Sequence, residues 1–269
     1  MKIDIITVFP DMVEAALRAG VLRRAQESGL LLVRVHNLRD FAEDKHRTVD
    51  DYPYGGGSGM VLKPAPIFNA VRFITESDCY NEVSSEQQYV REESGALSTA
   101  FKANPQSPPR VIYLTPQGRT LTQRLAEQLS LESHLILICG RYKGVDERVR
   151  QKLVTDEISI GDYVLSGGEL PALVLIDAVV RLIPGAIGDY ESAQEDSFSG
   201  DLLDCPNYTR PAEYDGMKVP EVLLSGHHER VRKWRRQQSL KRTFERRPEL
   251  LDIAYLSDED LAFIESLKV

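Results

Sequence analysis

Short apolar runs alternate with amphipathic stretches through the first 190 residues, and this alternation constrains the fold more than any other feature of the chain. Residues 111–114 (VIYL) and 135–139 (LILIC) are continuous apolar runs, as in strands that are covered on both faces. Stretches with helical spacing, residues 121–129 and 145–153, follow these runs. The alternation predicts an α/β fold that is built on a mostly parallel sheet.

The two ends of this region follow the same pattern. Residues 2–9 and 31–35 predict two further strands, and residues 157–160 predict a last one. Residues 11–28 have helical spacing and predict a helix with Asp11 as its N-cap.

A further helix is expected over residues 171–183, since it starts with a proline and ends before Pro184 and Gly185. It is apolar all round apart from Asp177 and Arg181, so we expect it to be buried. These two charges lie four residues apart on one face. They either form an internal ion pair, or Arg181 faces an anionic ligand and Asp177 orients it.

Two polar segments divide the chain. Residues 75–109 hold six acids and two bases and predict a surface insertion. Residues 187–203 are acidic and weakly apolar, and predict an interdomain linker. The expected organisation is therefore a domain over 1–186, this linker, and a small, mostly helical domain over 204–269.

The composition excludes several classes of protein. The longest uninterrupted apolar stretch has five residues, whereas a helix that spans a membrane needs about 20. The three cysteines are widely spaced and predict neither a disulfide framework nor a zinc site. We therefore expect a soluble, cytoplasmic protein with no membrane partner and no metal ligands.

The net charge of −8 is unevenly distributed along the chain. Residues 1–203 hold 21 bases and 29 acids, whereas residues 204–269 hold 12 of each. Residues 230–247 alone carry nine bases and one acid, interleaved with apolar side chains. Such a segment is either a solvated helix face or a surface that binds the phosphates of a nucleic acid. The side chains expected to contact RNA are Arg230, Lys233, Arg235, Arg236 and Arg242.

Three loops that contain glycine each follow the end of a predicted strand. They cover residues 114–119, 140–148 and 160–171. Open parallel sheets bind ligands at this edge, and glycine lets a ligand approach the backbone closely. The loops are either such a binding site or only tight connections. None matches the glycine pattern of a dinucleotide site or of a phosphate-binding P-loop.

For two further segments, the residues alone do not decide the role. Residues 52–60 hold four glycines within a span of five residues, and predict either a flexible linker or an ordered contact loop. Asp196 lies in the acidic linker, where a carboxylate is ordinarily solvated.

Taken together, these segments resemble the bacterial tRNA (guanine-N1-)-methyltransferases, knotted enzymes of the SPOUT class. The resemblance covers almost the whole chain, and its strings occur in order. They are IITVFPDM at 5–12, DDYPYGGGSGM at 50–60, VIYLTPQGR at 111–119, CGRYKGVDERV at 139–149, EISIGDYVLSGGELPA at 157–172, EDSFSGDLLDCPNYTRP at 195–211, VPEVLLSGHH at 219–228 and RRPELL at 246–251.

The resemblance implies a deep trefoil knot at the end of the first domain, with S-adenosylmethionine bound in it. It also implies methyl transfer to N1 of the guanosine at tRNA position 37, by a homodimer whose active sites are shared between subunits. The residues that it assigns to the donor site are Tyr113, Leu114, Thr115, Pro116, Gly140, Arg141, Tyr142, Ile160, Gly161, Asp162, Tyr163, Val164, Leu165, Gly167 and Gly168.

By the same resemblance, Asp196 is the general base and Arg181 the catalytic arginine. The chemistry agrees with these roles, because N1 of guanine carries a proton that a carboxylate can remove. Removal of this proton moves negative charge onto O6, which a cation can stabilise.

The chain departs from the family pattern at Lys143, where the family usually has glutamate. Mg²⁺ has been associated with the family, but no cluster of carboxylates in this sequence supports a metal site. Without the resemblance, the residues would also allow another α/β nucleotide-binding enzyme or a non-catalytic RNA-binding protein.

Overall fold

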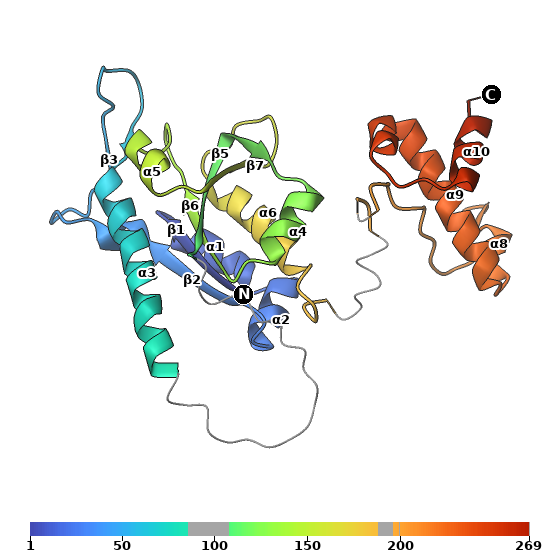
Figure 1. The fold of residues 1–269 in the computed structure, drawn as a ribbon, viewed down its shortest axis with the longest axis horizontal. Coiled ribbons are helices and arrows are strands. Elements are labelled where there is room, and N and C mark those ends of the chain that lie inside the picture. The colour runs from blue at the N-terminus through green and yellow to red at the C-terminus, as the bar shows by residue number, and fades with distance from the viewer. Residues whose placement is uncertain (86–107, 188–195, 199, 269) are drawn as a thin grey trace. The chain divides into compact units, whose positions relative to one another are not determined.

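The structure is a computed structural model that describes residues 1–85, 108–187, 196–198 and 200–268. It divides into two compact units, Met1–Gly188 and Asp189–Val269 (Figure 1). Among the described residues, no helix has both the length and the apolar character needed to cross a membrane.

The first unit is built on a five-stranded sheet with the strand order β2-β1-β6-β5-β7. Every neighbouring pair in it is parallel, which confirms the predicted α/β class. The strands are β1 (Lys2–Thr7), β2 (Leu32–Asn37), β5 (Arg110–Thr120), β6 (His134–Cys139) and β7 (Asp156–Ser159). A separate antiparallel pair consists of β3 (Asp50–Asp51) and β4 (Val61–Leu62).

Helices cover both faces of this sheet and enclose two apolar clusters. Residues of α1, α2, α4 and α6 form one cluster with the inner strands, and residues of α3 and α5 form the other (Figure 1). The helices are α1 (Pro10–Leu17), α2 (Gly20–Glu27), α3 (Pro64–Ser85), α4 (Gln123–Ser130), α5 (Glu147–Lys152) and α6 (Glu169–Val180), with a 3-10 turn η1 (Leu38–Phe41). Burial on both faces explains why β5 and β6 read as continuous apolar runs.

The expected helix over residues 11–28 is wrong in two respects. The segment forms two helices, because Ala19 is extended and Gly20 has a φ of +59°, and a continuous right-handed helix allows neither. Phe9 rather than Asp11 is the N-cap of α1, and Pro10 takes the first helical position, where its missing N–H costs nothing.

Two other boundaries also differ from the expectation. Helix α3 continues to Ser85, so the first residues of the segment 75–109 are helical, whereas residues 86–107 lie outside the described part. Helix α6 begins at Glu169, and its burial is one-sided rather than complete. Leu170 and Val174 are 46% and 47% exposed.

The second unit is a small set of helices with one short hairpin. Its core consists of Leu202, Leu240 and Ile264. The backbone N–H of Leu203 also donates to Thr243 Oγ1 (2.9 Å), so the end of the expected linker packs within this unit. The elements are β8 (Glu213–Tyr214), β9 (Met217–Lys218), α8 (Glu221–Leu224), α9 (His228–Arg246), η2 (Pro248–Asp252) and α10 (Asp258–Ser266).

Candidate functional site

A cavity of about 210 Å³ lies at the carboxyl ends of β5, β6 and β7 in the first unit. All three predicted loops contribute to its wall, as expected where parallel strands end side by side. Fourteen of the fifteen residues expected to bind the donor line this cavity, and Asp162 is the one that does not. The structure thus brings together three segments that are far apart in the sequence.

The first loop is a bulge within β5 rather than a connection after it. Leu114 and Arg119 both pair with Ile158 of β7, so the residues between them leave the plane of the sheet. Gly118 is required there, because a Cβ atom would lie 2.3 Å from the carbonyl carbon of Glu157. The bulge presents Thr115 and Pro116 to the cavity.

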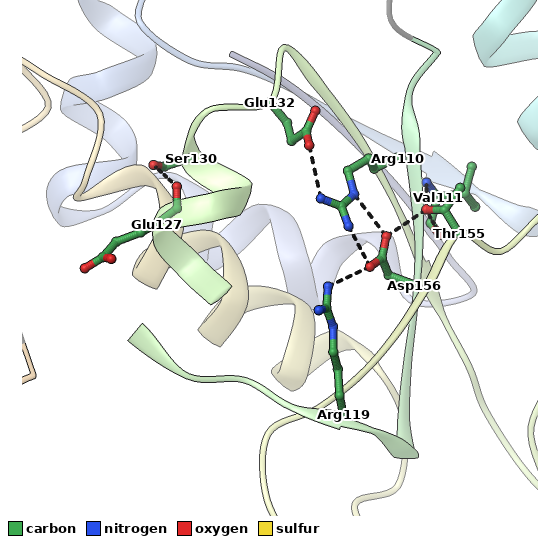
Figure 2. A network of polar contacts seen from close by, with 8 residues as sticks. All are labelled: Arg110, Val111, Arg119, Glu127, Ser130, Glu132, Thr155 and Asp156. Carbon is green, nitrogen blue, oxygen red and sulfur yellow. Dashed lines mark hydrogen bonds and ion pairs between the residues drawn. The ribbon is translucent and has the colours of Figure 1, made fainter. Parts of the chain in front are cut away.

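An ion-pair network anchors the base of this bulge (Figure 2). Asp156 accepts a bidentate pair of hydrogen bonds from Arg110 (3.0 and 2.7 Å) and a third from Arg119 (2.7 Å). Arg110 also donates to Glu132 (3.1 Å). Burial opposes ionisation of the Asp156 carboxyl, but the hydrogen bonds from Arg110 and Thr155 outweigh it and lower its pKa. The carboxylate therefore stays charged and ties both ends of β5 to β7.

The second loop packs closely against a buried tyrosine. A Cβ at Gly140 would lie 2.8 Å from Cε2 of Tyr113, and one at Gly144 would lie 2.9 Å from its Oη. Tyr142 has a φ of +59°, which turns the chain between these two glycines. Burial raises the pKa of Tyr113, so its hydroxyl stays protonated at neutral pH. The tyrosine and the two glycines together shape one wall of the cavity.

The third loop approaches the second through the backbone. Gly168 N donates to Gly140 O (2.9 Å), and Arg141 and Gly167 form an antiparallel bridge. A Cβ at Gly168 would lie 2.8 Å from Cα of Cys139. Only glycine allows the two loops to come this close.

A buried ion pair links this pair of loops to β1. Glu169 is fully buried, and its Oε2 lies 2.9 Å from Nε of Arg141. Thr7 Oγ1 donates to Glu169 Oε1 (2.7 Å), and the Arg141 guanidinium lies 4.4 Å from the centre of the Phe9 ring. A Cβ at Gly167 would lie 2.2 Å from Arg141 Nε. The Arg141 guanidinium is thus held within the protein, a role that the sequence pattern did not indicate.

The two expected catalytic residues belong to different units. Arg181 is the C-cap of α6 and is half-buried, not enclosed in an apolar helix as expected. Asp177 is exposed on the same helix, and its carbonyl oxygen accepts from Arg181 N (3.3 Å). Asp196 is half-buried in the second unit. The catalytic roles of Arg181 and Asp196 stay predictions.

Helix α9 carries the expected RNA-binding residues, but two of them, Arg236 and Arg242, bind other parts of the second unit. Arg236 pairs with Asp260 (2.9 Å) and donates to the carbonyl oxygen of Tyr255, so it joins α9 to α10. Arg242 donates to the carbonyl oxygen of Asp204 (2.9 Å). The remaining three, Arg230, Lys233 and Arg235, are exposed, and Lys233 pairs with Glu259.

The side chains that commonly hold metal ions do not gather in the described part of the chain. Within residues 1–85, 108–187 and 196–268, apart from 199, no group of three His, Cys, Asp or Glu side chains could hold a metal ion.

Comparisons with known proteins point to one family. Residues 1–253 match the family model of the tRNA (Guanine-1)-methyltransferase TrmD. The chain is 51% identical over 268 residues to the tRNA (guanine-N(1)-)-methyltransferase of Dictyoglomus turgidum, covering 100% of this chain and 97% of that protein. It is 50% identical to the protein of the same name from Halalkalibacterium halodurans, covering 100% and 98% of the two chains.

Proposed function

We propose, from the premise that this chain belongs to the tRNA (guanine-1)-methyltransferase family, that it methylates N1 of the guanosine at tRNA position 37. The family membership confirms the resemblance inferred from the sequence motifs. The methyl donor in this proposal is S-adenosylmethionine. The observation that carries it is the convergence of three separate glycine-containing loops on one cavity, with fourteen expected donor residues in its wall.

The cavity fits a donor that is held mainly by backbone groups. Gly140, Gly161, Gly167 and Gly168 each lie where a Cβ atom would come within 3 Å of a neighbouring atom. A side chain at any of these four positions would collide with the protein, so the loops keep bare backbone at the ends of the strands, where parallel sheets bind ligands. In this proposal the second and third loops belong to a trefoil knot. The hydrogen bond from Gly168 N to Gly140 O is consistent with it, because it holds the two loops side by side.

The bound donor supplies an electrophilic sulfonium methyl group, so the chain needs no covalent nucleophile. Asp196 accepts the proton from N1 of guanine, which turns N1 into the attacking nitrogen. Arg181 stabilises the negative charge that this step moves onto O6. A donor bound in the cavity would have to present its methyl group to N1 and leave as S-adenosylhomocysteine, and such positioning would supply much of the rate acceleration.

The proposed enzyme is a homodimer in which each active site takes residues from both subunits. Exposed apolar side chains near the cavity support this arrangement, because isolated units rarely leave such a group open to water. They are Phe9, the N-cap of α1, Met12 within α1, and Leu170 and Val174 on α6, with exposures between 39% and 47%. The basic face of α9 binds the tRNA phosphates.

The experiment that tests the proposed function is mass spectrometry of nucleosides from a tRNA transcript after incubation with the protein and S-adenosylmethionine. We expect 1-methylguanosine from a transcript with guanosine at positions 36 and 37. A transcript with adenosine at position 37 is the control and should yield none. Absence of 1-methylguanosine from the first transcript, with donor binding intact, would identify a non-catalytic RNA-binding protein instead.

A further inference from the structure

The cavity wall contains three cationic side chains, those of Arg141, Lys143 and Arg150, and none of its lining residues is a carboxylate. Arg141 lies 2.9 Å from Glu169, and Arg150 lies 2.7 Å from Glu157. No such ion pair is found for Lys143 with the described carboxylates. Lys143 is therefore the lining cation whose charge is left for a ligand.

Hydrogen bonds to Met60 and to β4, which follows it, hold the backbone around Lys143 in place. Lys143 N donates to Met60 O (3.0 Å), and Leu62 N donates to Gly144 O (3.0 Å). Leu62 also forms a parallel bridge with Val145. Because hydrogen bonds fix the backbone at Lys143 and at Gly144, the Cα atom of Lys143 has a defined place in the cavity wall.

The side chain of Lys143 then lies along the glycine-rich loop 55–59. A Cβ at Gly59 would lie 3.2 Å from Cγ and 3.3 Å from Cε of this lysine, and one at Gly57 would lie 3.5 Å from Nζ. Both glycines have positive φ values, +92° and +112°. Because these glycines carry no side chains, the aliphatic part of Lys143 packs directly against the backbone of the loop. The glycine-rich segment is therefore an ordered contact loop at this point.

We propose that Lys143 binds the carboxylate of the methionine part of the donor, with loop 55–59 supporting its stem. The inference rests on the proposed function, because the donor is the ligand that brings a carboxylate into this cavity. An ammonium group and a carboxylate form a charge-assisted hydrogen bond, which is stronger than a neutral one. Since Lys143 is exposed, solvent screens the pair, and we expect a contribution of roughly fivefold to tenfold in affinity.

The test is isothermal titration of the full chain with two ligands that differ in the carboxylate. S-Adenosylhomocysteine carries it, whereas 5′-methylthioadenosine lacks the whole amino-acid end. We expect Lys143→Met to weaken binding of S-adenosylhomocysteine roughly fivefold to tenfold and to leave 5′-methylthioadenosine within twofold. Lys143→Arg should restore most of the loss. Lys45→Met removes an exposed lysine outside the cavity and should change neither affinity.

The outcomes separate this inference from the function on which it rests. If S-adenosylhomocysteine binds the wild type and Lys143→Met equally, the carboxylate contact is refuted while the donor site stands. Equal losses for both ligands also refute it, and assign Lys143 to the shape of the cavity. A loss confined to tRNA binding refutes it in favour of a phosphate contact. If the wild type binds neither ligand, the proposed donor site itself fails, and the inference fails with it.

Discussion

Gly140 offers a sharp test of the cavity, because its substitution by alanine adds a single methyl group to the wall. Its Cβ would lie 2.8 Å from Cε2 and 2.9 Å from Oη of Tyr113, closer than packed atoms allow. The tyrosine is buried at 5% exposure and lines the cavity, so its ring has little room to yield. The predicted effect is overpacking at the donor site rather than backbone strain.

The expected magnitude follows from the cost of overpacking, which is about 1–3 kcal/mol for an added methyl group in a packed interior. For a unit of this size, each kcal/mol lowers Tm by roughly 2–4 °C. Displacement of the Tyr113 ring also changes the cavity wall, so we expect Gly140→Ala to weaken S-adenosylhomocysteine binding about tenfold or more. Scanning calorimetry and isothermal titration measure the two effects separately.

Two further variants make this prediction specific. Gly200→Ala is the matched control, because a Cβ there meets no atom within 4 Å, and we expect it to change neither Tm nor affinity. Tyr113→Leu removes the atoms that clash, so the double variant with Gly140→Ala should lose less stability than the two single losses added together. The reasoning is refuted if Gly140→Ala keeps wild-type Tm and wild-type affinity.

Three other predictions concern parts of the chain away from this contact. Asp4 is fully buried between His36 (2.6 Å) and His134 (2.7 Å); burial opposes its ionisation, but these hydrogen bonds and the charge of Lys2 outweigh that and lower its pKa. The stabilisation from its charged form is therefore fully present above the unfolded-state pKa of about 3.9 and is lost as pH falls from there through the lower folded-state pKa. Asp4→Asn should cost about 3 kcal/mol at pH 7 and progressively less towards pH 2 in urea melts. A pH-independent difference would contradict this. Asp196→Asn should keep the affinity for S-adenosylhomocysteine and lower the single-turnover methylation rate at least 100-fold, and a near-wild-type rate would remove Asp196 as the base. On α9, Arg230→Glu should weaken tRNA binding and flatten the salt dependence of that binding, with Tm unchanged. Arg236→Met breaks the contact with Asp260 and should lower the Tm. Equal effects of the two variants on Tm would refute the assignment of Arg230 to RNA binding and of Arg236 to the fold.

The sheet could be predicted from the sequence because burial on both faces leaves a direct signature. The runs at 111–114 and 135–139 are strands for that reason, and glycines mark the loops that follow them. The break before α2 was missed, since helical spacing continues through this segment although α1 ends at Leu17, Ala19 is extended and Gly20 has a φ of +59°. Likewise, α6 carries apolar residues on all sides, so its sequence does not indicate which side packs against the rest of the first unit and which side is exposed.

The candidate site was predictable where backbone geometry demands glycine and unpredictable where side chains meet across the fold. The loops around Gly140 and Gly167 follow from their positions after strands. The pair between Arg141 and Glu169 joins residues 28 positions apart, and neither residue type nor spacing indicates that contact. For the same reason, the charge run in α9 did not distinguish Arg236, which pairs with α10, from residues that face solvent.

Hydrogen exchange followed by mass spectrometry tests the central claim, that three loops form one donor site, most directly. Saturating S-adenosylhomocysteine should slow exchange in residues 113–119, 140–145 and 160–168 together, because each loop contributes backbone groups to the same cavity. Residues 228–246 of α9 should exchange at an unchanged rate. Protection of only one loop, or of none, would contradict the account.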